Sequence, residues 1–195
     1  DIFVRTYDKK KEFTKSFAFR MKTDSEKKLT RNTGFYERTK KLTRNFVDAR
    51  GFWLPNDYTK HGVINEYTAC REKAVVIDLS SLRKFEILGP DAEELMNYTL
   101  TRNIKKLSVG QIVYSAMCYE NGTMFDDGTL LRLSETGFRW VCGDEYAGEW
   151  LKEQVKKKKY KVIIKNSTDQ INNISVQGPN SRKILEKIIF TPPTQ

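Results

Sequence analysis

"IVYSAMCYENGTMFDDGTLLRL", residues 112–133, predicts a β-hairpin at the centre of the fold. Asn121 and Gly122 form the strongest short signal for a two-residue type I′ turn, because both central residues of that turn need positive φ. Apolar residues flank the turn on both sides, as expected for a half-buried pair of strands. Strands seldom carry aspartate, so the adjacent carboxylates of Asp126 and Asp127 in the returning strand require an explanation.

Placing the turn at Asn121 and Gly122 sets the pairing of the two strands, since directly opposed residues share a face and the face alternates along each strand. One face is then expected to carry Tyr114, Ala116, Cys118, Phe125, Asp127, Thr129, Leu131 and Leu133. The other is expected to carry Ser115, Met117, Tyr119, Met124, Asp126, Gly128, Leu130 and Arg132. The two aspartates therefore point to opposite sides of the hairpin.

This pairing predicts different roles for the two carboxylates. Asp127, opposite Ala116, is expected at the floor of an apolar hollow, where a carboxylate is costly unless it binds something. Asp126, on the face of Arg132, is expected to be half-solvated or paired. Two alternatives stay open: Asp127 accepts backbone N–H groups at a bulge near Gly128, or a three-residue turn exchanges the faces.

The rest of the chain alternates between strand and helix patterns. Strands are expected near residues 75–82, 83–89, 112–119, 138–143, 160–165 and 173–178, and helices over residues 61–74, 89–100 and 145–157. "GFWLP" at 51–55 is expected to pack as a loop. Together these elements predict an α+β fold, a mostly antiparallel sheet with packed helices.

A strand, a Gly-Pro pair and a helix occur twice, in "FEILGPDAEELM" and in "ISVQGPNSRKIL". One interpretation is a duplication of two such units within one sheet. The other is coincidence, because Gly-Pro is a common entry to a helix.

The net charge of +10, from 35 basic and 25 acidic residues, favours either an anionic partner or a solvated surface of mixed charge. "KKKKYK" (156–161) ends a predicted helix, where cations suit the negative helix terminus, so no nucleic-acid partner is expected. No apolar run is long enough for a membrane span, and one histidine excludes a multi-histidine metal site. Three cysteines without metal-ligand spacing favour the reducing cytoplasm.

Several segments together resemble the glycine-cleavage T-protein family of aminomethyltransferases. The hairpin is similar to the family's G-x-x-x-Y-x-x-M…E-x-G-G-x-x-D-D segment. Matching segments in the same order are "TGFYERTKKL", "GFWLP", "AVVIDLSSLRKFEILGPDAEELMNYTLTRNIKKL" and "ISVQGPNSRKIL". Residues 31–195 are thus expected to be the N-terminal part of such a folate-binding domain, with the family's C-terminal part absent. Residues 1–30 are expected to form an irregular or extended basic arm.

The resemblance implies an enzyme that transfers a one-carbon unit to tetrahydrofolate from a methylated amine or an aminomethyl donor, with a lipoyl-bearing carrier protein as a candidate partner. Asp127 corresponds to the family's active-site aspartate. The positions implied to contact the folate are Tyr114, Leu82, Thr129 and Leu131.

Departures from the family pattern bear on the donor. Thr123 stands at the second glycine of the motif, "DLSSL" (78–82) lacks the family's histidine and methionine, and "VCGDE" (141–145) replaces a Val-Asn-Ala segment. These changes favour a paralogue with a different methylated donor. The alternative is a non-catalytic folate-binding protein that assists iron–sulfur cluster maintenance. Its usual Lys-Gly-Cys-Tyr-x-Gly-Gln motif does not occur in this chain.

Overall fold

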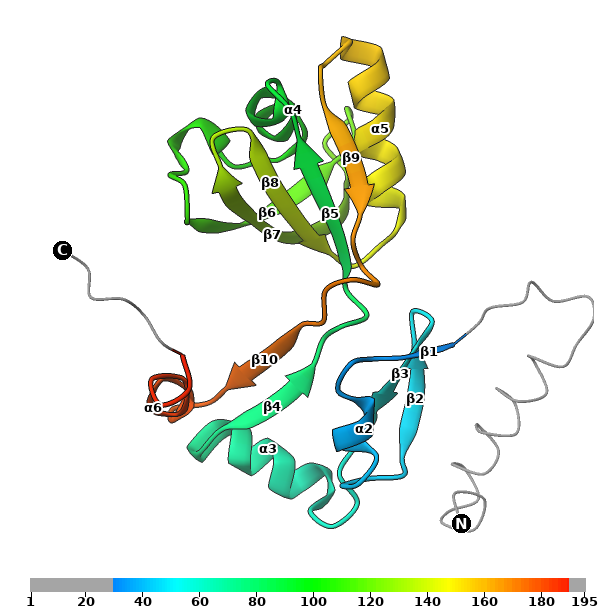
Figure 1. The fold of residues 1–195 in the computed structure, drawn as a ribbon, viewed down its shortest axis with the longest axis vertical. Helices are drawn as coiled ribbons and strands as arrows, with labels where there is room; N and C mark the ends of the chain where they lie inside the picture. Colours follow the sequence, from blue (N-terminus) through cyan, green and yellow to red (C-terminus); the bar gives the residue numbers. More distant parts are fainter. Residues whose placement is uncertain (1–29, 190–195) are drawn as a thin grey trace, which may run out of the picture. The chain divides into compact units, whose positions relative to one another are not determined.

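The computed structural model describes residues 30–189, which divide into two compact units (Figure 1). Unit 2 is a single stretch, residues 82–171, and unit 1 holds the described residues on either side of it. The arm predicted for residues 1–30 lies outside the described residues except for Thr30.

Unit 2 is built on a five-stranded sheet in the order β6-β7-β8-β5-β9, in which every neighbouring pair is antiparallel. Its strands are β5 (Arg83–Leu88), β6 (Ile112–Cys118), β7 (Met124–Ser134), β8 (Gly137–Cys142) and β9 (Ile163–Asn166). Its helices are α4 (Ala92–Thr99), the short 3₁₀ turn η1 (Ile104–Lys106) and α5 (Tyr146–Lys158). The predicted α+β class with a mostly antiparallel sheet is confirmed.

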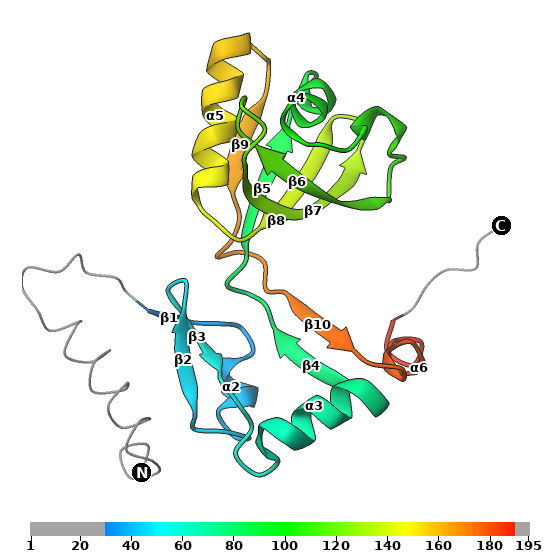
Figure 2. The same cartoon turned by 180° about the vertical axis from the view of Figure 1, so that it is seen from behind.

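The core of unit 2 lies between one face of this sheet and the helices α4 and α5 (Figure 2). Across three strands, Leu130, Trp140 and Phe85 stand opposite one another and are almost fully buried. The other core residues are Ile87, Ala92, Leu95, Met96, Leu100, Ile104, Met117, Phe138, Cys142, Ala147 and Leu151. Since strand side chains alternate, the sheet's second face carries none of these residues.

The prediction of a two-residue type I′ turn is wrong, because the hairpin has a longer turn. The backbone N–H of Gly122 donates to the carbonyl of Tyr119 at 2.9 Å, and that of Tyr119 donates to the carbonyl of Thr123 at 2.9 Å. Gly122 has φ of 84°. A three-residue loop that ends in a left-handed glycine is the next most common hairpin solution, and it needs positive φ only at the glycine.

A β-bulge then restores the register that the longer turn would have exchanged. Cys118 pairs with Met124 rather than with Phe125, and the register shifts next to this pair. One extra residue on the returning strand reverses the effect of one extra residue in the turn, because side chains alternate with a period of two. The predicted pairing of Ala116 with Asp127 is therefore correct.

Unit 1 contains two small sheets and three helices. The first sheet has the order β1-β3-β2, from β1 (Arg31–Asn32), β3 (Phe52–Pro55) and β2 (Phe46–Ala49), and the second pairs β10 (Ile174–Gln177) with β4 (Val75–Asp78). The helices are α2 (Tyr36–Thr39), α3 (Gly62–Glu72) and α6 (Ser181–Leu185). The loop predicted at 51–55 is thus a strand, paired on both sides.

The two Gly-Pro segments are alike locally but do not share a sheet. Gly89, after β5, has φ of 144°, and Gly178, after β10, has φ of 129°. A Cβ at Gly89 would lie 2.2 Å from the carbonyl oxygen of Lys161, and one at Gly178 would lie 2.6 Å from that of Lys73. Both turns therefore require glycine, yet β5 and β10 belong to different sheets and units. The predicted duplication within one sheet is wrong.

Candidate functional site

The second face of the five-stranded sheet, here called the open face, carries no helix of unit 2. Tyr114 on β6 pairs with Thr129 on β7, and the neighbouring pairs are Ala116 with Asp127 and Ile112 with Leu131. Tyr114 is 59% exposed. The structure thus brings four of the five predicted site residues, namely Tyr114, Asp127, Thr129 and Leu131, to one surface. Leu82 lies just before β5 instead, and β7 and β8 stand between β5 and β6.

Tyr114 and Asp127 are directly bonded. The phenol O–H of Tyr114 donates a hydrogen bond to Oδ2 of Asp127. The two residues are diagonal neighbours across β6 and β7, within reach of a long aromatic side chain. The hydrogen bond to the Asp127 carboxylate, followed by desolvation, raises the pKa of the Tyr114 phenol above its usual value. The pair therefore offers a carboxylate whose orientation is fixed by a neutral phenol.

The surroundings of Asp127 correct one prediction. Asp127 is exposed in the structure rather than lying at the floor of an apolar hollow. The reason is that helices α4 and α5 cover the opposite side of the sheet, where Met117 and Leu130 lie. An exposed carboxylate keeps its hydration and remains free to accept further hydrogen bonds from a ligand.

Asp126 is the acceptor for backbone N–H groups, a role that the sequence left open for Asp127. It is 8% exposed, and its carboxylate accepts the backbone N–H groups of Asp127 at 2.9 Å, Gly143 at 3.3 Å and Asp144 at 3.2 Å. Burial and then the nearby Asp126 carboxylate raise the pKa of the Cys142 thiol well above its usual value. Asp126 thus ties the end of β8 to β7 and fixes the backbone at Asp127.

The open face also carries an ion pair. Nε of Arg139, on β8, donates to Oε1 of Glu86, on β5, at 2.7 Å. Alternation in "KFEIL" and "FRWVC" could have placed these two side chains on one face, but only the pairing of β5 with β8 sets them opposite each other.

The chain matches the family model for the GCVT N-terminal domain over residues 35–192. The chain belongs to this family. The predicted resemblance is thereby confirmed, and the five-stranded sheet with its open face is part of a GCVT N-terminal domain.

Named relatives agree with this assignment. The chain is 52% identical to trimethylamine-oxide aldolase of Ruegeria pomeroyi over 195 residues, which is 100% of this chain and 25% of that protein. It is 31% identical over 163 residues to aminomethyltransferase of Natranaerobius thermophilus, covering 82% of this chain and 43% of that protein. These relatives are enzymes, and the chain spans less than half the length of each.

A solved structure shows the same fold. The glycine cleavage system aminomethyltransferase T from Bartonella henselae superimposes with a TM-score of 0.68 at 25% identity, covering 81% of this chain and 43% of that one. The GCVT N-terminal domain of this chain is therefore similar to the corresponding part of a longer enzyme.

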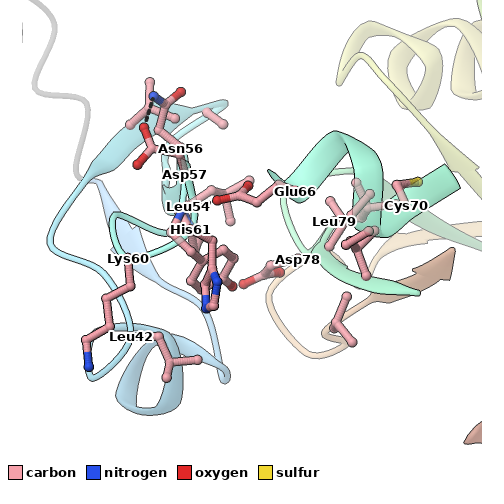
Figure 3. Close-up of a pocket in the computed structure, with 18 of the residues that line it drawn as sticks. Leu42, Leu54, Asn56, Asp57, Lys60, His61, Glu66, Cys70, Asp78 and Leu79 are labelled. Carbon is pink, nitrogen blue, oxygen red and sulfur yellow. Dashed lines mark hydrogen bonds between the residues drawn. The ribbon is translucent and has the colours of Figure 1, made fainter. Parts of the chain in front are cut away.

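A cavity of about 830 Å³ lies within unit 1 of this GCVT N-terminal domain (Figure 3). Its lining combines apolar residues such as Leu42, Leu54 and Leu79 with polar residues that include His61, Glu66 and Asp78. None of the five predicted site residues lines it. Its wall comes from several separated segments, which is why no local sequence pattern indicated it.

The two carboxylates of this cavity support its walls. Glu66 accepts the backbone N–H of Tyr58 at 2.5 Å, while Asp78 accepts the hydroxyl of Thr33 at 2.6 Å and the N–H of Ser80 at 3.0 Å. Burial, then Asp78 and Glu66, raise the pKa of the Tyr58 phenol above its usual value. Both acids thus hold loops in place, and the cavity is a separate candidate from the open face.

Across residues 30–189, no helix combines the length and the apolar character that a membrane crossing needs. Within the same range, no three residues among His, Cys, Asp and Glu come together as metal ligands would.

Proposed function

We propose that this chain is the tetrahydrofolate-binding part of an enzyme that transfers a one-carbon unit, methylene or methyl, from a methylated amine or aminomethyl donor. The observation that carries the proposal is the hydrogen-bonded pair of Tyr114 and Asp127 on the open face of a GCVT N-terminal domain. Asp127 is proposed as the catalytic residue. Tyr114, Thr129, Leu131 and Leu82 are proposed as folate contacts.

The residues of the open face fit such a cofactor. The exposed ring of Tyr114 offers a flat apolar surface, and the partly buried Thr129 and Leu131 continue it along β7. Asp127 is an acceptor for N–H groups, which a reduced pterin presents along its edge. Bound tetrahydrofolate would supply the nitrogen that receives the one-carbon unit.

Asp127 has two tasks in this proposal. Its carboxylate holds an N–H group of the ligand in a fixed orientation, and it stabilises positive charge that develops near the transferred carbon. Tyr114 is a positioning residue for it, because its phenol donates to Oδ2 and leaves Oδ1 available. The raised pKa of Tyr114 keeps this donor protonated over the physiological range.

The donor is proposed to be a methylated amine, with trimethylamine oxide or its demethylation product as the first to test. The support is the 52% identity with a trimethylamine-oxide aldolase, against 31% with an aminomethyltransferase. An aminomethyl group on a lipoyl carrier remains the second choice. We place the protein in the cytoplasm on the basis of its cysteines. The non-catalytic alternative is disfavoured by the intact Asp126 and Asp127 pair.

Isothermal titration of tetrahydrofolate into the chain tests the proposal. Wild type is expected to bind, and Asp127→Asn is expected to bind about tenfold more weakly, the equivalent of one hydrogen bond to a charged group. Glu153→Gln makes the same change of charge at an exposed position of α5 and is expected to bind like wild type. In the complete enzyme, Asp127→Asn is expected to abolish transfer. Absence of tetrahydrofolate binding to wild type would overturn the proposal.

A further inference from the structure

We propose that Arg139 forms a binding subsite for a carboxylate on the open face, and that this subsite anchors the ligand whose reacting end lies at Tyr114 and Asp127. The inference rests on the proposed function for the identity of that ligand. Arg139 lies on β8 directly opposite Leu131 of β7, so it shares the face of the candidate site.

The guanidinium group of Arg139 is held in place by one of its nitrogens only. Its Nε donates to Oε1 of Glu86 at 2.7 Å, and the same oxygen accepts the hydroxyl of Ser167 at 2.7 Å. The side chains of Arg139 and Glu86 are 27% and 14% exposed. Neither terminal amino group of Arg139 has a hydrogen-bond partner among residues 30–189. The fork is therefore oriented, while its two outer nitrogens remain available.

Arg132, on the opposite face of the same sheet, shows what a structural arginine looks like in this unit. Its Nη1 donates to Glu93 at 2.5 Å and to the carbonyl of Leu107 at 2.8 Å, and its Nη2 donates to Glu135 at 3.1 Å. Its side chain is 9% exposed. Both terminal amino groups of Arg132 thus bind the protein itself, whereas those of Arg139 are directed to no protein acceptor.

The charge around Arg139 favours an anion. Glu86 pairs with Arg139 on one side and with Lys165 of β9 on the other, so the three side chains stand in one row across the open face. Lys165 is exposed. Two cations flank a single carboxylate in this row, which leaves one positive charge unmatched. A guanidinium with two free amino groups binds a carboxylate with two parallel hydrogen bonds.

The spacing along the sheet agrees with a ligand that has a polar ring at one end and a carboxylate at the other. Leu131, the partner of Arg139, lies four residues beyond Asp127 on β7. At a rise of ~3.3 Å per residue this corresponds to roughly 13 Å along the strand. A folate has such a shape, because an aminobenzoyl spacer separates its pterin from a glutamate. A methylated amine that carries a carboxylate, which trimethylamine oxide does not, is the other source of the same chemistry.

Titrations of the chain with small carboxylates test the subsite without a pterin. The probes are 4-aminobenzoyl-glutamate, which represents the folate tail, and N,N-dimethylglycine, which represents a carboxylate donor. At least one probe is expected to shift the side-chain ¹⁵N resonances of Arg139 in wild type. Arg139→Gln is expected to lower the affinity for that probe about tenfold. Arg139→Lys is expected to recover part of this loss.

Lys152→Gln is the matched control, because it removes the same charge from an exposed position of helix α5, on the other side of the sheet. It is expected to bind the probes like wild type. Equal weakening by Arg139→Gln and Lys152→Gln would reduce the effect to net charge and overturn the subsite. So would unshifted Arg139 resonances in wild type, a result that requires no variant to fold.

Tetrahydrofolate as a third ligand separates the subsite from the proposed function. If wild type binds tetrahydrofolate, and Arg139→Gln binds tetrahydrofolate and the probes as tightly as wild type does, the subsite fails and the proposed function stands. If a probe binds at Arg139 while wild type does not bind tetrahydrofolate, the proposed function fails and the subsite stands. If Arg139→Gln weakens the binding of dimethylglycine alone, the subsite takes the carboxylate of the donor. If it weakens the binding of 4-aminobenzoyl-glutamate alone, the subsite takes the carboxylate of the folate.

Discussion

Trp140 and Val141 are neighbours on β8, yet they lie on opposite faces of the five-stranded sheet and in different surroundings. Trp140 is fully buried among the residues of helices α4 and α5 and of the adjoining strands. Val141 is partly exposed on the open face, the face of the Tyr114 and Asp127 pair. One face is thus mainly apolar and stabilises the fold, and the few charged groups on it, such as Asp126 and Arg132, are bonded to the protein itself. The other carries the charged and hydroxyl groups that a ligand would need.

The largest expected difference between the faces is in stability. Trp140→Ala is expected to lower the free energy of unfolding by about 3–5 kcal/mol, because it removes a large buried side chain and leaves a cavity. Val141→Ala, one residue along on the open face, is expected to cost less than ~1.5 kcal/mol. Urea denaturation followed by circular dichroism measures both values. Similar losses at the two positions would show that the open face is as well packed as the core.

The two aspartates compare the same two faces at adjacent residues, with a smaller expected difference in stability. Asp126→Ala is expected to lower the free energy of unfolding by about 1–3 kcal/mol, since three backbone N–H groups lose their common acceptor. Asp127→Ala is expected to change it by less than ~0.5 kcal/mol, as for most exposed positions. The same urea titrations apply. A greater loss from Asp127→Ala than from Asp126→Ala would contradict the assignment of the two faces.

The smallest expected effect is on the ionisation of Tyr114. A phenol that donates to a carboxylate is stabilised in its protonated form, so the pKa of Tyr114 lies above its usual value. Asp127→Asn removes the negative charge, and the pKa of Tyr114 is expected to fall toward the ordinary tyrosine value. A pH titration by NMR of ring-labelled tyrosine, assigned with Tyr114→Phe, measures the shift. An unchanged pKa in Asp127→Asn would mean that the two side chains do not interact.

Sequence patterns predicted most elements of unit 2, because their apolar periodicity is strong and local. They were wrong on the hairpin turn, where Gly122 ends a three-residue loop, and on 51–55, where pairing with two strands forms β3. The correct pairing of Ala116 with Asp127 resulted from two opposite errors, a longer turn and an unforeseen bulge. Bulges depend on how the whole sheet twists and packs, so no short segment encodes them by itself.

The placement of the candidate site residues on the sheet was predicted in the same partial way. Alternation placed Tyr114 and Asp127 on one face, and the structure adds the hydrogen bond between them. No sequence pattern indicates Arg139, because its partner Glu86 is far from it in the sequence and meets it only when β5 pairs with β8. The sequence also assigned the apolar hollow to the wrong side, since both hairpin faces contain apolar residues.

The sequence by itself determined that Asp126 and Asp127 point to opposite sides of a strand, because consecutive strand residues always do. It also determined membership of the family, through motifs spread over most of the chain. Only the tertiary structure decided which aspartate is buried. Helices α4 and α5 cover the face of Asp126, a choice that depends on packing between distant segments. Asp127 is left on the open face, bonded to Tyr114 and free to accept a ligand.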